Sequence, residues 1–207
     1  EIVKEAAVEI HVVPCELPAL DLIHTEWFYS DCLADYYGVE VFSGEYWRIV
    51  ENFVRTAGRH RYNMLLTPIF TPPLDTAVGG ERRTVQLVDV SVQADGSYTF
   101  GFEKLERWVE MAKRCGIRFF EMSHLFTAAP KIMAEKDGIC QQIFGWDTDA
   151  AGEVYRAFLH AFLEALKPEL EKLGIEKETY FHVSDEPSME QIDSYRAAKE
   201  AVAEDLK

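Results

Sequence analysis

Two adjacent carboxylates end an apolar run in the last sixth of the sequence. The run Thr179–Ser184 (TYFHVS) is typical of a β-strand, and Asp185, Glu186 and Pro187 follow it directly. Neighbouring carboxylates raise each other's proton affinity, so that one of them can stay protonated near neutral pH. A protonated carboxyl group is what general acid catalysis requires. We therefore expect Glu186, with Asp185 beside it, to be the catalytic pair.

The tripeptide Asp185–Pro187 also has a purely structural interpretation. Asp-Glu-Pro is a common turn sequence, and its negative charges would stabilise the N-terminus of the helix predicted from Ser188. The catalytic interpretation is favoured because the pair ends a strand that is predicted to be buried.

One face of the same strand can contribute to a site. Alternation along a strand places His182 and Ser184 on the same face as Glu186. His182 is therefore a candidate substrate-binding residue, and the alternative is a histidine whose nitrogens are satisfied within the core.

Polar residues also stand at the ends of other apolar runs that are predicted strands. These runs are Leu22–Phe28, Met64–Phe70 and Ile117–Met122. The substrate-binding candidates that the first and third runs provide are His24, Glu26, Trp27, Glu121 and His124. The two glutamates have the alternative of pairing with arginines such as Arg118. Trp146, in an irregular loop, is a candidate sugar platform, with a core position as its alternative.

Each predicted strand is followed by an amphipathic helix, and these helices begin after Ser43, after Phe102, near Ala150 and at Ser188. Strand–helix alternation indicates an α/β fold with a parallel sheet, interrupted here by a β-hairpin that turns at Asp95-Gly96. Long loops after the strands, without a glycine-rich nucleotide motif, favour a (β/α)8 TIM barrel. Such barrels place the active site at the C-terminal ends of their strands.

Four units would make only the first half of a barrel. Half a barrel leaves its edge strands open above an exposed core, which folded proteins avoid. We therefore expect residues 17–207 to be the N-terminal half of a barrel completed beyond Lys207. The alternative is a homo-oligomer in which two chains close one barrel. Residues 1–16 are predicted to be the last strand of a preceding β-domain and a linker.

The charge balance restricts the kind of partner. The 207 residues include 21 Lys+Arg and 36 Asp+Glu, for a formal net charge of −15. This balance argues against nucleic acid or an anionic membrane surface as the main partner. No apolar run approaches the roughly 18 residues that a membrane span needs. A neutral or cationic small molecule fits better.

The cysteines are few and widely spaced. Cys15, Cys32, Cys115 and Cys140 form no C-x-x-C pair, which argues against a disulfide framework and a thiolate-bound zinc. Free thiols favour a reducing, cytoplasmic compartment, and an export signal ahead of Glu1 is the alternative. We predict no metal and no cofactor.

Five segments together resemble the catalytic barrel of family 123-type glycoside hydrolases. They are His24–Phe28, Glu45–Trp47, Arg61–Met64, Glu121–His124 and above all Phe181–Pro187, and the resemblance extends from about Leu17 to the C-terminus. It implies hydrolysis of β-linked N-acetylhexosamine, of the N-acetylgalactosamine type, and a β-sandwich ahead of the barrel. On this resemblance Asn63 joins the predicted substrate-binding residues.

The resemblance also implies a mechanism, substrate-assisted retention. Glu186 would protonate the leaving glycosidic oxygen and later deprotonate water, while the 2-acetamido oxygen of the substrate attacks the anomeric carbon. Asp185 would hold the acetamido N–H. An adjacent carboxylate pair suits this exception better than the separated pair of most glycosidases.

Two other functions stay open on the sequence. One is a metal-dependent barrel enzyme that places His24, Glu26, His124, His182 and Asp185 around a divalent ion, although no H-x-H pattern supports it. The other is a non-catalytic carbohydrate-binding barrel. It is suggested by the short connection at residues 125–130, where relatives usually carry a longer loop.

Overall fold

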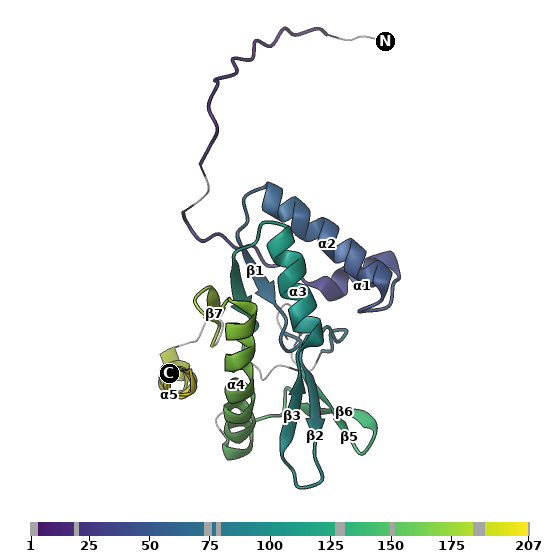
Figure 1. The fold of residues 1–207 in the computed structure, drawn as a ribbon, viewed down its shortest axis with the longest axis vertical. Coiled ribbons are helices and arrows are strands. Elements are labelled where there is room, and N and C mark those ends of the chain that lie inside the picture. The colour runs from purple at the N-terminus through teal and green to yellow at the C-terminus, as the bar shows by residue number, and fades with distance from the viewer. Residues whose placement is uncertain are drawn as a thin grey trace.

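The described part of the chain contains two sheets and five α-helices, shown as a computed structural model in Figure 1. The structure describes residues 4–18, 21–72, 76–77, 80–126, 131–149, 152–183 and 189–206. The helices are α1 (Ser30–Tyr37), α2 (Gly44–Arg59), α3 (Glu103–Arg114), α4 (Glu153–Leu173) and α5 (Ile192–Asp205), with a 3-10 turn at Met189–Gln191. The strands are β1 (Met64–Thr67), β2 (Asp89–Val92), β3 (Tyr98–Gly101), β4 (Phe119–Met122), β5 (Ile132–Lys136), β6 (Ile139–Phe144) and β7 (Thr179–Phe181).

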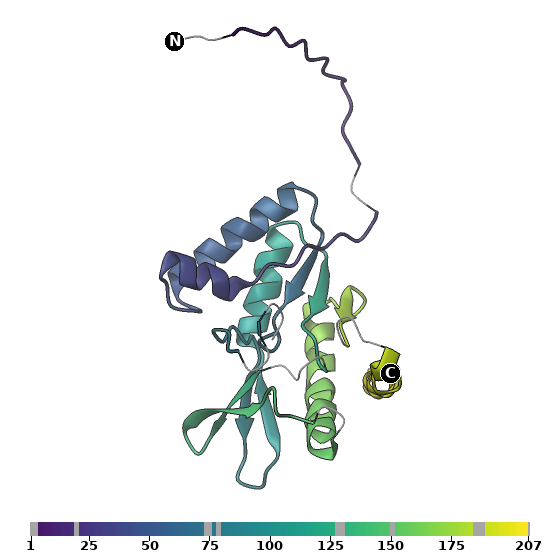
Figure 2. The same cartoon turned by 180° about the vertical axis from the view of Figure 1, so that it is seen from behind.

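The strands form one parallel and one mixed sheet. The parallel sheet has the order β1-β4-β7, and the mixed sheet has the order β3-β2-β5-β6. The predicted hairpin is confirmed, because β2 and β3 pair antiparallel around the turn at Asp95-Gly96. The mixed sheet lies beyond the C-terminal ends of β1 and β4 (Figures 1 and 2), where the Leu87 N–H donates to the Pro68 carbonyl.

The predicted half of a TIM barrel is wrong. Residues 21–29 form no strand, so the parallel sheet has three strands, and the described residues contain no closed barrel. The reason is that residues 21–29 make no ladder with β1: the N–H groups of Asn63 and Met64 both donate to the single carbonyl of His24. The long connection after β4 instead contributes β5 and β6 to a second sheet.

The beginning of the chain also differs from the prediction. Residues 4–18 contain no helix or strand and extend away from the rest of the molecule (Figure 1). Val8, Ile10 and Val12, which alternate as in a strand, are exposed. The assignment of residues 1–16 to a preceding domain stays a prediction.

None of the helices in the described ranges is long and apolar enough to cross a membrane.

One face of the parallel sheet carries the core. Leu65, Phe120 and Met122 are buried in the same cluster as apolar side chains of α2, α3 and α4. The cluster continues onto the mixed sheet, where the rings of Phe100 and Phe162 lie 5.5 Å apart. The neighbouring residues in β1 and β4 alternate to the opposite face, which is therefore free to form a site.

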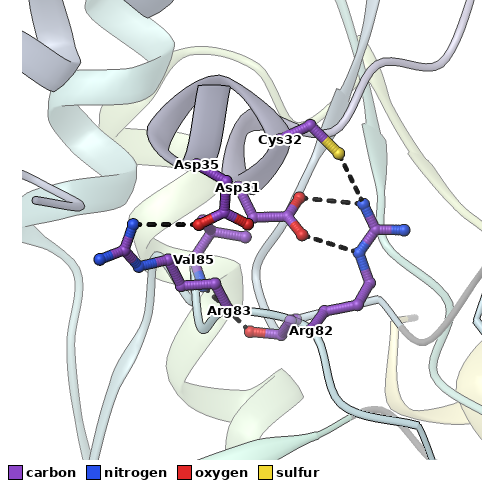
Figure 3. A network of polar contacts seen from close by, with 7 residues as sticks. Asp31, Cys32, Asp35, Arg82, Arg83 and Val85 are labelled. Carbon is purple, nitrogen blue, oxygen red and sulfur yellow. Dashed lines mark hydrogen bonds and ion pairs between the residues drawn. The ribbon is translucent and has the colours of Figure 1, made fainter. Parts of the chain in front are cut away.

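Segment 80–85 is tied to α1 by a buried ion pair (Figure 3). Arg82 donates to both carboxylate oxygens of Asp31, at 2.8 and 3.0 Å, and the two side chains are 9% and 6% exposed. The guanidinium also lies 4.0 Å from the ring centroid of Tyr29. Arg83 and Asp35 form a second pair nearby at 3.1 Å, but it is exposed to solvent.

Because one ion pair is buried and the other is exposed, we expect breaking them to have very different effects on the free energy of unfolding. Asp31→Ala leaves the Arg82 charge buried beside Tyr29, and we expect it to lower the free energy of unfolding by about 3 kcal/mol. The same change at Asp35, in the same helix, is expected to cost less than about 1 kcal/mol because that pair is exposed. Urea unfolding of both variants measures the difference, and equal losses would contradict the assignment of Asp31–Arg82 as a buried pair.

A second prediction concerns the contact between α2 and α3. A methyl group on Gly58 would lie 2.0 Å from the carbonyl oxygen of Cys115, so the two helices can approach only where residue 58 has no side chain. Gly58→Ala should therefore lower the free energy of unfolding by about 1–3 kcal/mol, although alanine favours helix. Gly44→Ala in the same helix is the control, because apart from its chain neighbours and the backbone of its own helix no atom lies within 4 Å of the added methyl group. Thermal unfolding that ranks the two variants alike would refute the close approach.

Candidate active site

The face of the parallel sheet opposite the core carries polar side chains. In the sheet register, Glu121 of β4 lies between Leu66 of β1 and Tyr180 of β7. His182 comes two residues after Tyr180 and shares its face. Its Nδ1 lies 2.9 Å from the Glu121 Oε1, so the ends of two neighbouring strands join in one hydrogen bond.

Trp27 completes this contact from residues 21–29. Its indole N–H donates to the Glu121 Oε2 at 2.9 Å, so each oxygen of the carboxylate has its own partner. Glu121 is only 8% exposed. Burial opposes its ionisation, but the hydrogen bonds with His182 and Trp27 outweigh burial and hold the pKa of Glu121 below its ordinary value. Glu121 is therefore a buried, ionised hydrogen-bond acceptor.

His124 packs behind this group and is fully buried. Its ring centroid lies 3.7 Å from that of His182 and 5.3 Å from that of Trp27. Neither ring nitrogen has a hydrogen-bond partner within the described part of the chain. Burial, and to a smaller extent the neighbouring His182, lowers the pKa of His124 to about 4. The ring is therefore neutral near neutral pH.

A cavity of about 510 Å³ lies beside these residues. Its volume is within the range of small-molecule sites. Its polar lining comes from the parallel sheet, from residues 21–29 and from α5, and includes Thr25, Glu121, Tyr180, His182, Tyr195 and Lys199. Aromatic rings beside hydrogen-bonding groups suit a sugar, which has both apolar faces and hydroxyl groups.

Some of these lining residues were not predicted from the sequence. The strand alternation that selects His182 also places Tyr180 on the same face, so a signal for Tyr180 was present. Tyr195 and Lys199 are four residues apart and so lie on one face of α5. The sequence gives no signal that this face of α5 lines the cavity.

Three predicted binding residues lie at the other end of β1. Asn63 directly precedes β1; its Oδ1 accepts from the His24 N–H at 2.7 Å, and its Nδ2 donates to the Leu22 carbonyl at 2.9 Å. The His24 ring stacks on Tyr62, 4.6 Å between centroids. The Glu26 carboxylate lies 3.7 Å from the His24 Nε2. Asn63 thus holds residues 22–24 beside β1. The chain that follows then places Trp27 next to Glu121.

The remaining predicted residues lie outside this group. Trp146 lines a separate cavity of about 220 Å³, and its indole N–H donates to the Gly80 carbonyl at 3.0 Å. Asp185 and Glu186 fall in residues 184–188, outside the described residues, as do residues 127–130 of the short connection. The last described residues before the carboxylate pair, His182 and Val183, line the cavity of about 510 Å³.

The geometry does not favour the metal-dependent interpretation. Within the described ranges, no three His, Cys, Asp or Glu side chains are grouped to hold a metal ion. The Nδ1 of His182 is already engaged with Glu121, and His24 and Glu26 lie toward the start of β1. Asp185, the remaining proposed ligand, lies outside the described residues.

The comparison with known families settles the assignment of the chain. The sequence model described as the glycoside hydrolase 123 catalytic domain matches residues 27–207, which is most of the chain. The chain belongs to glycoside hydrolase family 123. The predicted resemblance is therefore confirmed, and residues 27–207 match the catalytic-domain model of this family.

A solved structure of a family 123 glycoside hydrolase from Clostridium perfringens, described as acting on glycolipid glycans, is similar in fold. It has a TM-score of 0.65 and 14% sequence identity, over 85% of this chain and 32% of that chain. The chain thus spans about a third of that protein's length. No curated protein matches the chain.

The buried, neutral His124 predicts a specific pH dependence of stability. Its pKa is about 4 in the folded protein against 6.5 when unperturbed, so protonation favours the unfolded chain. This contribution to stability is complete above pH 6.5 and is lost as the pH falls toward about 4. We expect the free energy of unfolding to fall by about 2 kcal/mol more in the parent protein than in His124→Phe between about pH 8 and pH 5.

Urea unfolding at several pH values measures this difference. The pKa of Glu121 is held below its ordinary value of 4.5, so most of its titration lies below this window, and Glu121 is present in both proteins. Parallel pH curves for the parent protein and His124→Phe would show that His124 is not held neutral by burial.

Proposed function

We propose that this family 123 domain hydrolyses β-linked N-acetylhexosamine, with Glu186 as the acid and base and Asp185 as the partner of the acetamido group. The observation that carries the proposal is the position of the pair in the chain. Asp185 and Glu186 follow, by two and three residues, Val183, which lines the cavity at the C-terminal end of β7. Family membership supports the reaction class.

The adjacency of the two carboxylates supports a substrate-assisted reaction. In the proposed first step, the 2-acetamido oxygen forms a bond to the anomeric carbon while the bond to the leaving oxygen breaks, and Glu186 gives that oxygen its proton. In the second step, Glu186 removes a proton from water, which attacks the same carbon and opens the cyclic intermediate. Enzymes that supply their own nucleophile use two carboxyl groups about 5 Å apart across the bond.

The lining of the cavity supports a sugar of this kind. His182 and Lys199 offer hydrogen-bonding groups, and Tyr180 and Tyr195 contribute aromatic rings. The similar Clostridium perfringens enzyme is described as acting on glycolipid glycans, which also favours a glycan as the natural substrate. The acidic chain, with a net charge of −15, fits a neutral amino sugar better than an anionic ligand.

Two substitutions test the proposal directly. With aryl β-glycosides as substrates, we expect hydrolysis only when the sugar carries a 2-acetamido group. Glu186→Gln should lower kcat at least about 100-fold, because the amide cannot transfer a proton. Asp185→Asn should lower kcat for the same substrates, because the amide loses the charge that polarises the acetamido group.

A control and two contradicting outcomes complete the test. Glu110→Gln, on the exposed face of α3, makes the same chemical change away from the cavity and should leave kcat unchanged. Full activity of Glu186→Gln would disprove its role as acid and base. Equal hydrolysis of glycosides without the acetamido group would disprove substrate assistance.

A further inference from the structure

We propose that Glu121, held in place by the Trp27 N–H, is a positioning residue that fixes the tautomer of His182, so that the His182 Nε2 accepts a hydrogen bond from a hydroxyl or amide N–H of the bound sugar. The effect on KM that this proposal predicts rests on the proposed function. The tautomer itself can be measured by NMR without substrate, so that test is independent of the proposed function.

The first step of the argument concerns Trp27. An indole nitrogen can only donate a hydrogen bond. Trp27 donates to the Glu121 Oε2, which fixes the direction of that bond. The ionised Glu121 carboxylate can only accept. His182 must therefore place a proton on Nδ1 to form its 2.9 Å bond with Oε1.

The second step follows from the chemistry of imidazole. A neutral ring with its proton on Nδ1 has a lone pair on Nε2. Within the described part of the chain, no residue forms a hydrogen bond with the His182 Nε2. The side chain is 25% exposed and lines the cavity of about 510 Å³. The free acceptor is therefore available to a ligand there.

Ring packing holds this arrangement in place. The His182 ring centroid lies 3.7 Å from that of His124 and 5.5 Å from that of Trp27. A flipped His182 ring would turn a carbon toward Glu121 and lose the hydrogen bond. The neutral His124 adds no charge beside His182, so Glu121 alone determines which nitrogen carries the proton.

The acceptor also complements the other groups at the cavity. The Lys199 ammonium can only donate hydrogen bonds, and Glu121 has no oxygen without a partner. Among these three side chains, His182 is the one with an acceptor atom that has no partner in the described part of the chain, and this atom can accept a hydrogen bond from a ligand hydroxyl or amide N–H. This assigns His182 a binding role and Glu121 a positioning role.

Glu121→Gln tests the proposal because it should reverse the tautomer. The Trp27 N–H needs an acceptor, so the new amide must turn its carbonyl toward Trp27 and its NH₂ toward His182. The His182 Nδ1 must then accept, and the proton moves to Nε2. In this variant we expect KM for the acetamido substrate to rise about tenfold, with a smaller change in kcat.

A second substitution should reverse this effect. Trp27→Phe removes the donor, which frees the amide of residue 121 to turn its carbonyl toward His182. The double variant Trp27→Phe/Glu121→Gln should therefore recover the Nδ1–H tautomer and a KM closer to that of the parent protein. Trp27→Phe alone leaves the carboxylate facing His182 and should keep the parent tautomer. A merely structural role for Glu121 predicts losses that add.

Nitrogen-15 NMR of the histidine side chains at pH 8 reads the tautomer directly, with His182→Asn to identify the signals and Glu110→Gln as the control. We expect Nδ1–H in the parent protein, Nε2–H in Glu121→Gln and Nδ1–H in the double variant. A parent ring protonated on Nε2, or on both nitrogens, would overturn the proposal, and this holds even if Glu121→Gln fails to fold. If Glu186→Gln keeps full activity while the tautomer changes as expected, the proposed function fails and this inference stands.

Discussion

The ionised carboxylate of Glu121 is the constraint on which the candidate site depends. A carboxylate that is only 8% exposed is costly unless both oxygens are hydrogen-bonded. Its partners, Trp27 and His182, lie 94 and 61 positions away in the sequence. The two hydrogen bonds to the Glu121 carboxylate therefore hold three separate segments of the chain together. Losing either partner would leave a buried charge with an unpaired oxygen. This cost keeps the three segments in place and makes the site rigid.

The surrounding fold serves this contact by bringing the three segments together. The parallel pairing of β4 with β7 places Glu121 near His182. The amide of Asn63 holds residues 22–24 beside β1, and this directs Trp27 toward the same point. The core lies on the other face of the sheet, so one layer of strands separates apolar packing from polar chemistry.

The sequence predicts the elements of this fold better than their assembly. The apolar runs at β1, β4 and β7 and the stripes of α2 and α3 are local patterns, and the structure contains these elements. Residues 22–28 have the same local pattern but form no hydrogen-bond ladder. A ladder needs a second strand in the right register, and the sequence of one segment does not show whether such a strand is available. Helix α1 is short, and one of the contacts that hold it, between Asp31 and Arg82, joins residues 51 positions apart in the sequence.

The same reasoning explains what could be predicted of the site. The rule that polar residues gather at the C-terminal ends of strands predicts that Glu121, His124 and His182 lie close together, as they do in the structure. It does not distinguish which of them would bind a ligand and which would position a neighbour, because this depends on individual hydrogen bonds. The separation of Trp146 into another cavity depends on the mixed sheet, which only the full set of strand pairings defines.

The central claim is that the acetamido group of the substrate provides the nucleophile. Inhibition by a thiazoline-fused analogue of N-acetylhexosamine, a stable mimic of the cyclic intermediate, tests this claim most directly. Since analogues of high-energy states bind at least about 100-fold tighter than substrates, we expect competitive inhibition with Ki at least that far below KM. Hydrolysis of the β-N-acetylhexosaminide that this compound does not inhibit would contradict the account.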